Sequence, residues 1–200
     1  MKKIVVELNQ ASVQQAINYL KNLRKNITKM MDEFLEFACE WIINRANHYI
    51  ALSDLGDLVK MDIRNNWGYV VSNGSAKIEN IYDKAVFVEF GVGIVGQENP
   101  HPQSNVEGYI YNMPSESKRA GLYHDENTWR FITNDKDLID LPSDSYETWE
   151  MASGSLKIIT RGTKGVWYAY HAIVDAQMDL QNPNGAFATE WRKIKERYIV

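Results

Sequence analysis

Residues 86–102, "VFVEFGVGIVGQENPHP", hold three closely spaced glycines, a glutamate among apolar residues and a histidine between two prolines. Glycines at 91, 93 and 96 spell GxGxxG, a spacing that lets backbone N–H groups approach a pyrophosphate in dinucleotide-binding proteins. That chemistry needs a strand that feeds directly into a helix. The following residues, "QENPHP", are unsuited to the first turns of a helix. The spacing therefore does not predict nucleotide binding, and no cofactor is expected.

Acid–base chemistry has one candidate in the same stretch. Glu89 lies among apolar residues and could act as the general acid of a small hydrolase. A carboxylate paired for structural reasons is the favoured interpretation. His101 lies between Pro100 and Pro102, and we expect an exposed, rigid side chain that shapes the loop. No Ser or Cys nucleophile lies in a recognisable elbow, so no catalytic residue is predicted.

Metal and sugar binding have weaker candidates. The four histidines show no ligand spacing such as HExxH, so no metal site is predicted. His124, Asp125 and Glu126 could bind a cation or serve a hydrolase, although solvated side chains are the simpler interpretation. Aromatic residues between 109 and 149 could stack on sugars, but aromatic residues at strand spacing more often pack a small sheet or an interface. They are Tyr109, Tyr111, Tyr123, Trp129, Phe131, Tyr146 and Trp149.

Composition and charge disfavour some classes of protein. The 200 residues carry a net charge of −4, which disfavours a protein that works by neutralising nucleic-acid phosphates. The single cysteine, Cys39, lies in an apolar pattern and is expected to be a buried, reduced thiol. The apolar run of "MKKIVVEL" is too short for a signal peptide, and no window is long enough to cross a bilayer. We expect a protein made in a cytosol, with no membrane partner.

A long helix comes first among the expected elements. From Ser12 onward, apolar residues recur every three or four positions, and no Gly or Pro interrupts them before Gly56. Basic residues precede acidic ones along this helix, which opposes the helix macrodipole. They form a basic block (Lys21, Arg24, Lys25 and Lys29) and an acidic block (Asp32, Glu33, Glu36 and Glu40). Two solvated patches or contacts between neighbouring subunits would both explain the blocks.

Strands and a second helical region follow. Residues 59–64, 67–72, 76–82 and 85–90 read as strands, with "SNGS" as a hairpin turn and 85–90 as a central strand. Residues 91–121 hold five of the twelve glycines and three of the five prolines, which predicts an irregular excursion. A strand at 156–162 and helices at 165–180 and 186–198 complete the chain. The fold class is α+β: one domain over residues 1–200, with a long helix on a mainly antiparallel sheet and an inserted β arm at 91–155.

Two segments together resemble the HK97 gp10-like family of tailed-bacteriophage proteins. "AVFVEFGVGIVGQENPHP" is similar to the family's V-E-F-G-T-G strand end with its later proline–histidine pair. "RGTKGVWYAYHAIVDAQMDL", residues 161–180, is similar to the return from a variable insert into an aromatic-rich helix. Val92 replaces the usual threonine, and Val166 stands where a proline is common. The motif residues are Phe87, Glu89, Phe90, Gly91, Gly93, Gly96, Pro100, His101, Pro102, Lys164 and Gly165.

The resemblance implies a structural virion protein without enzymatic activity. Such proteins form rings at the neck or complete the tail, so the implied partners are further copies of the chain and other phage head, neck and tail proteins. Genomic DNA would pass through the ring without sequence-specific binding, and a negative net charge suits that channel. Localisation would be the virion, after assembly in the bacterial cytoplasm. A carbohydrate-binding module and a small hydrolase remain the alternatives.

Overall fold

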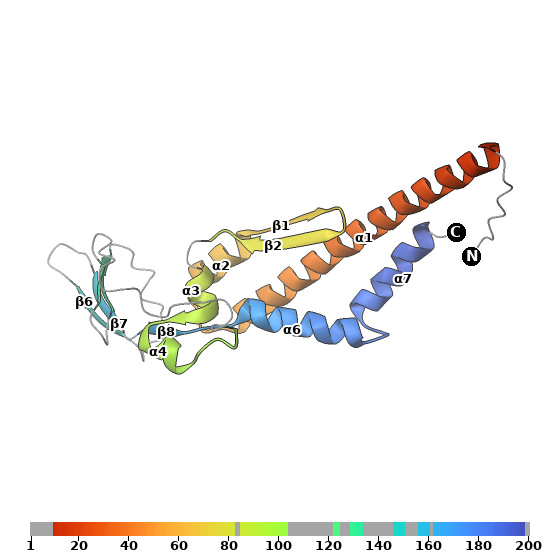
Figure 1. Cartoon of the computed structure of the whole chain (residues 1–200). Coiled ribbons are helices and arrows are strands. Elements are labelled where there is room, and N and C mark those ends of the chain that lie inside the picture. Colours follow the sequence, from red (N-terminus) through yellow and green to blue (C-terminus); the bar gives the residue numbers. More distant parts are fainter. Residues whose placement is uncertain are drawn as a thin grey trace. The chain divides into compact units, whose positions relative to one another are not determined.

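The computed structural model describes residues 10–82, 85–103, 122–124, 129–133, 146–150, 156–160 and 162–198. Within them the fold is α+β, with a long N-terminal helix packed on a two-stranded antiparallel sheet (Figure 1). The helices are α1 Gln10–Leu52, α2 Asp57–Asn65, α3 Ala85–Phe90, α4 Gly93–Glu98, α6 Tyr168–Gln181 and α7 Ala186–Tyr198. The strands are β1 Trp67–Ser72, β2 Ser75–Asn80, β3 Gly91–Val92, β4 Leu122–His124, β5 Trp129–Thr133, β6 Tyr146–Glu150, β7 Leu156–Thr160 and β8 Gly162–Lys164.

The chain divides into two compact units. The first takes in α1 up to Trp41, Tyr69–Ile78 of the β1–β2 hairpin, and the chain from Gln177 onward. The second takes in Ile42–Gly68 and Glu79–Ala176. A single domain over residues 1–200 stays a prediction.

Aromatic side chains hold the first unit together. Phe187 of α7 packs against Phe34, Phe37 and Trp41 of α1 with ring centroids 6.0, 5.8 and 5.0 Å away. Arg197, near the end of α7, makes a 2.8 Å ion pair with Glu33. The long helix predicted from the 3–4 spacing is therefore confirmed as α1, and α7 covers the middle part of α1.

The core of the second unit lies between α1, α2 and α6. Ala46, Ile50, Ile63, Tyr168 and Ala172 are buried there, with Val59 packed against them. The Tyr168 hydroxyl donates a 3.2 Å hydrogen bond to the Ala85 carbonyl oxygen. Burial raises the pKa of the Tyr168 phenol, and the Glu89 charge raises it further, so this side chain stays a neutral donor.

The predicted strand at 59–64 is wrong, because these residues belong to α2. The alternation of Val59, Met61 and Ile63 with polar residues suggested a strand face. In the structure Ile63 is buried whereas Met61 is 50% exposed, so the period is that of a helix. Val59 and Ile63, four residues apart, face the core together. The predicted strands at 67–72 and 76–82 and the turn at "SNGS" are confirmed by β1 and β2.

The predicted central strand at 85–90 is also wrong, because these residues form α3. Valine and phenylalanine favour strands, but tertiary contacts override that preference. Ala85 and Glu89, four residues apart, are both buried on one side of this helix.

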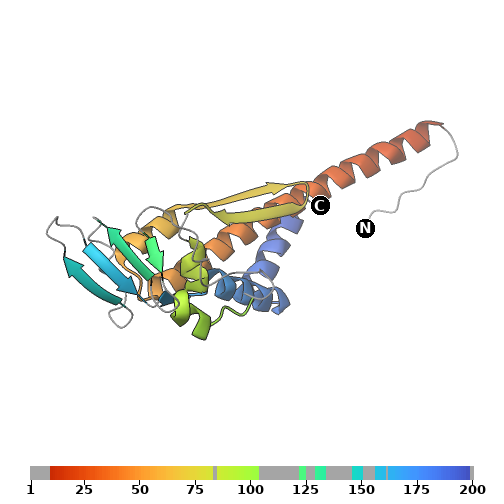
Figure 2. The ribbon, with the colours of Figure 1, turned by 60° about the vertical axis from the view of Figure 1, so that its left-hand side comes forward.

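A four-stranded antiparallel sheet lies between β3 and β8 in the sequence, in the order β4-β5-β7-β6. Ile158 of β7 pairs with Phe131 of β5 on one side and with Thr148 of β6 on the other. Figure 2 shows these strands side by side. The inserted β region is thus confirmed, and it continues to β7, beyond the predicted limit of residue 155. The predicted helices at 165–180 and 186–198 correspond to α6 and α7.

Candidate functional site

The Glu89 carboxylate closes the N-terminal end of α6. Its Oε2 accepts a 2.9 Å hydrogen bond from the Ala169 N–H, and its Oε1 accepts one of 2.9 Å from the Tyr170 N–H. The first N–H groups of a helix have no partner within that helix, and the positive end of its macrodipole favours a negative charge. Glu89 is only 7% exposed. The favoured interpretation of a paired structural carboxylate describes this arrangement.

His101 is the third partner of the Glu89 carboxylate and is buried, which contradicts the expectation of an exposed side chain. The ring is 3% exposed, and its Nε2 lies 3.0 Å from Glu89 Oε1. Because Nδ1 accepts a 3.0 Å hydrogen bond from the Gln103 N–H, we assign the proton to Nε2, which donates to Glu89. The flanking Pro100 and Pro102 are exposed, so only the histidine between them turns inward.

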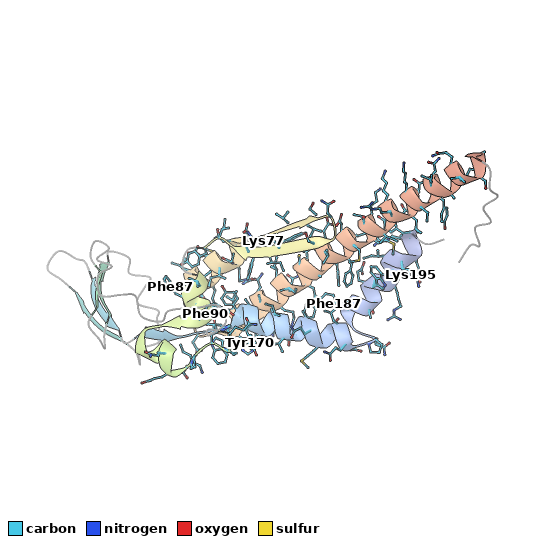
Figure 3. The ribbon with its side chains drawn as sticks, in the orientation of Figure 1. Lys77, Phe87, Phe90, Tyr170, Phe187 and Lys195 are labelled. Atoms are coloured by element: carbon cyan, nitrogen blue, oxygen red, sulfur yellow. The ribbon has the colours of Figure 1, made fainter. Side chains whose placement is uncertain are left out.

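Aromatic rings surround the Glu89–His101 pair. The His101 ring lies 4.2 Å from the Phe90 centroid and 5.4 Å from that of Tyr170. Figure 3 labels Phe90 on α3 and Tyr170 on α6. The Trp167 ring centroid lies 6.1 Å from that of His101. A histidine between two prolines has no sequence signal for this burial, because the contacts come from residues at least 66 positions later as well as from Phe90.

Backbone contacts join the same two segments. The Val166 N–H donates a 2.8 Å hydrogen bond to the Val88 carbonyl, and the Trp167 N–H donates one of 3.2 Å to the Glu89 carbonyl. Gly91 pairs with Lys164 in the β3–β8 ladder. The carbonyl groups of Val88 and Glu89, two of the last four of α3, which have no partner within that helix, are thereby satisfied. The structure brings Glu89, Phe90, Gly91, His101, Lys164 and Gly165 together.

The glycines of the GxGxxG spacing have different roles. Gly91 has φ 80°, the left-handed conformation that commonly ends a helix and that glycine adopts at little cost. It ends α3, not the predicted strand. Gly93 begins α4 and Gly96 is buried within it, so a helix does follow β3, contrary to the expectation. This helix has only six residues. Phe87, the remaining motif residue, is half-buried in α3.

The Glu89 site is suited to holding segments together more than to catalysis. Both carboxylate oxygens already accept hydrogen bonds from the protein. Among the described residues no group of three or more His, Cys, Asp or Glu side chains could hold a metal ion. A surface hollow of about 700 Å³ lies elsewhere in the second unit. It is lined by Asn47, Ala51, Asp57, Lys60, Met61, Arg64 and Asn65.

The other candidate sites fall largely outside the described side chains. Asp125, Glu126, Tyr109 and Tyr111 lie outside the described residues. His124 belongs to β4, where it pairs with Trp129 of β5 in the backbone register. The hydrolase and sugar-binding alternatives that rest on these residues remain predictions.

The sequence did not predict the structural roles of two further carboxylates, those of Asp179 and Asp175. In the first unit, Asp179 accepts hydrogen bonds of 3.1 and 2.9 Å from the Ala186 and Phe187 N–H groups, and so caps α7 as Glu89 caps α6. Gly185, just before α7, has no side chain that could do this. An aspartate seven residues before a helix start is too common to be a sequence signal.

In the second unit, Asp175 accepts hydrogen bonds of 2.8 Å from both Arg45 Nε and the Tyr49 hydroxyl. Burial by itself raises the pKa of the Asp175 carboxyl, but the hydrogen bonds from Arg45 and Tyr49 outweigh it and hold that pKa below its usual range. This cluster ties α1 to α6.

The two charge blocks of α1 differ in their surroundings. In the acidic block, Asp32 accepts a 2.8 Å hydrogen bond from the Gly74 N–H, Glu33 pairs with Arg197, and Glu40 accepts one of 3.0 Å from Tyr69. Glu36 is exposed. The basic block is exposed, has no partner in the described part of the chain, and lines a second hollow of about 400 Å³ with Thr28 and Asn73.

Cys39 is buried as expected, with 2% exposure. Burial raises the pKa of its thiol, and the charges of Glu36 and Glu40 add to that effect. Among the described helices, none has a stretch long and apolar enough to cross a membrane.

Comparison with known proteins adds no relative. No protein-family model matches the chain, and neither the curated proteins nor the solved structures include a significant match.

Proposed function

We propose that this chain is a structural subunit of a phage neck or tail, which forms an oligomeric ring in head-to-tail joining or tail completion. The proposal rests on the resemblance of two segments, residues 85–102 and 161–180. One observation supports it most. The two segments contact each other through the Glu89 carboxylate, Gly165 and the Gly91–Lys164 pair, so they behave as one structural motif.

A ring subunit also needs surfaces that its own fold leaves open. The basic block of α1 is exposed and unpaired in the described part of the chain. Apolar residues near the start of the same helix are exposed as well, including Leu20 at 58% and Ile27 at 49%. Further copies of the chain and other head, neck or tail proteins are the proposed partners, with DNA passing through the ring.

The first test is the solution mass by light scattering at low and high salt, together with negative-stain images. We expect closed rings. The decisive test is mass spectrometry of nuclease-treated, gradient-purified particles of the phage whose genome encodes the chain. Peptides of the chain at a constant stoichiometry relative to the major tail protein are expected. Their absence from intact particles would overturn the proposal.

A further inference from the structure

Helix α1 carries an apolar seam with a strict heptad repeat. From Val13 the seam positions follow one another at alternating spacings of three and four, which places a and d residues of a coiled coil on one side. They are Val13, Ala16, Leu20, Leu23, Ile27, Met30, Phe34, Phe37 and Trp41. Such a seam needs a second helix along its whole length.

Within the described part of the chain, α7 packs on the later half of the seam, and its aromatic contacts with α1 do not extend to the earlier half. Its own apolar residues Phe187, Trp191, Ile194 and Tyr198 are spaced by four, three and four. Phe187 contacts Phe34, Phe37 and Trp41, and Trp191 lies 5.4 Å from Phe34. The end of α7 is marked by the Arg197–Glu33 ion pair, and α1 continues beyond it toward Gln10 (Figure 1).

Exposure changes at that point. Met30 is 3% exposed, whereas Ile27, Leu23, Leu20 and Val13 are 49, 39, 58 and 41% exposed. Isolated exposed apolar residues are ordinary, but a continuous row that extends an occupied helix–helix interface indicates a missing helix.

The charges around the open half favour a second copy of the same helix. Positions e and g flank the seam and decide which helices pair. Over this half they are Ser12, Ile17, Tyr19, Arg24, Asn26 and Met31, with a single charge. Lys21, Lys25 and Lys29 occupy the outer positions b, f and c. An acidic partner helix would find a single basic residue, Arg24, to pair with at positions e and g. In a parallel pair of identical helices, Arg24 of one copy lies opposite Tyr19 of the other, so no like charges meet there.

We propose that residues 13–27 of α1 form a parallel two-stranded coiled coil with the same residues of a second copy. At position a, Val13 and Ile27 are β-branched and Leu20 is not, and Leu23 is at position d. β-Branched residues at a with leucine at d favour two parallel strands. The two helices separate near Met30, where α7 occupies the seam of each copy. This inference goes beyond the proposed function and holds whether or not the chain is a virion protein.

The test compares two matched double variants by sedimentation equilibrium. Leu20→Ser with Leu23→Ser changes the seam, and Lys21→Ser with Lys25→Ser introduces the same residue at outer positions. We expect the seam variant to associate at least about 100-fold more weakly than the wild type, because apolar burial is lost from both copies. The outer variant should associate at least as tightly as the wild type, since it removes like charges, and wild-type association should tighten as salt rises.

Disulfide cross-linking tests the direction of pairing. In a Cys39→Ala background, Val13→Cys should cross-link two copies under mild oxidation, and Lys25→Cys should not. In an antiparallel pair centred on Leu20, the two residues 13 would be about 20 Å apart. A wild-type monomer at 100 µM, an unchanged mass in the seam variant, or a dimer without the Val13→Cys cross-link would each overturn the inference. A dimer that never closes into rings would count against the proposed function and leave this inference intact.

Discussion

The carbonyl oxygen of Glu89 lies so close to Gly165 that a Cβ atom added at residue 165 would be 2.4 Å from it. Two further backbone atoms of Phe90 would be within 2.8 Å. Backbone atoms cannot move aside as a flexible side chain can, so the contact excludes every residue but glycine at this position.

Gly165→Ala is therefore expected to lower the free energy of unfolding by about 2 kcal/mol or more. The matched control is Gly68→Ala, because a Cβ at residue 68 would have no atom within 4 Å and would lie in a strand. Urea unfolding followed by circular dichroism measures both. Equal stability of the two variants would contradict the close contact.

Glu89→Gln should destabilise the fold without altering its size. A glutamine offers one carbonyl oxygen, so its NH₂ group must face either the Ala169 N–H or the pair formed by the Tyr170 N–H and His101. An unsatisfied buried donor costs about 1–3 kcal/mol. Thermal unfolding measures the loss, with exposed Glu196→Gln as control. If a hydrolase used Glu89, the variant would instead lose activity at unchanged stability.

Asp179→Ala is expected to lower the stability of the fold by about 1 kcal/mol, the typical effect of losing a helix cap. The carboxylate serves two N–H groups of α7, and Gly185 cannot replace it. Asp54→Ala, at an exposed position, is the control. Because α7 carries Phe187 and Trp191, tryptophan fluorescence during urea unfolding should report the change. A loss no larger than that of the control would show that capping contributes little.

Asp175 should make stability depend on pH in the acid range. Its folded pKa lies below the usual value, so its contribution is complete above the unfolded pKa of about 3.9 and is lost as the pH falls through the folded pKa. The partly exposed Arg45–Asp175 pair limits the effect to about 1 kcal/mol or less.

We therefore expect Asp175→Asn to be less stable than the wild type at pH 7 and to approach it as the pH falls below 4. Unfolding by urea at a series of pH values measures this difference, and Asp54→Asn provides the baseline. A difference that does not change with pH would rule out the ionised carboxylate as its source.

The spacing of apolar residues predicts an element correctly where it is compatible with only one type of secondary structure. The 3–4 spacing identifies α1, and "SNGS" between two alternating runs identifies the β1–β2 hairpin. For residues 59–64, alternation coincides with an i, i+4 pair, and the short sequence cannot decide between strand and helix. Residues 85–90 are of types that favour a strand, but they form α3. In this helix they accept hydrogen bonds from residues 166–170.

The Glu89 site, too, was predictable only in part from the sequence. Its membership was predictable in part, since Glu89, Gly91, Lys164 and Gly165 all belong to the two segments that resemble one family. Its geometry was not. The Glu89 oxygens bind N–H groups about 80 positions away, and nothing local to His101 indicates that its ring is buried against Phe90.

The Gly91–Lys164 pair has a consequence for how the chain can vary. The segment between these residues leaves and returns at adjacent points, so its ends stay together whatever its length. Doubling such a loop changes its closure entropy by only about 0.6 kcal/mol, less than the expected effect of one methyl group at residue 165. Insertions and deletions between Gly91 and Lys164 should therefore be tolerated, whereas a single methyl group added at residue 165 is not. The place where these two strands pair is thus suited to the exchange of whole inserted modules.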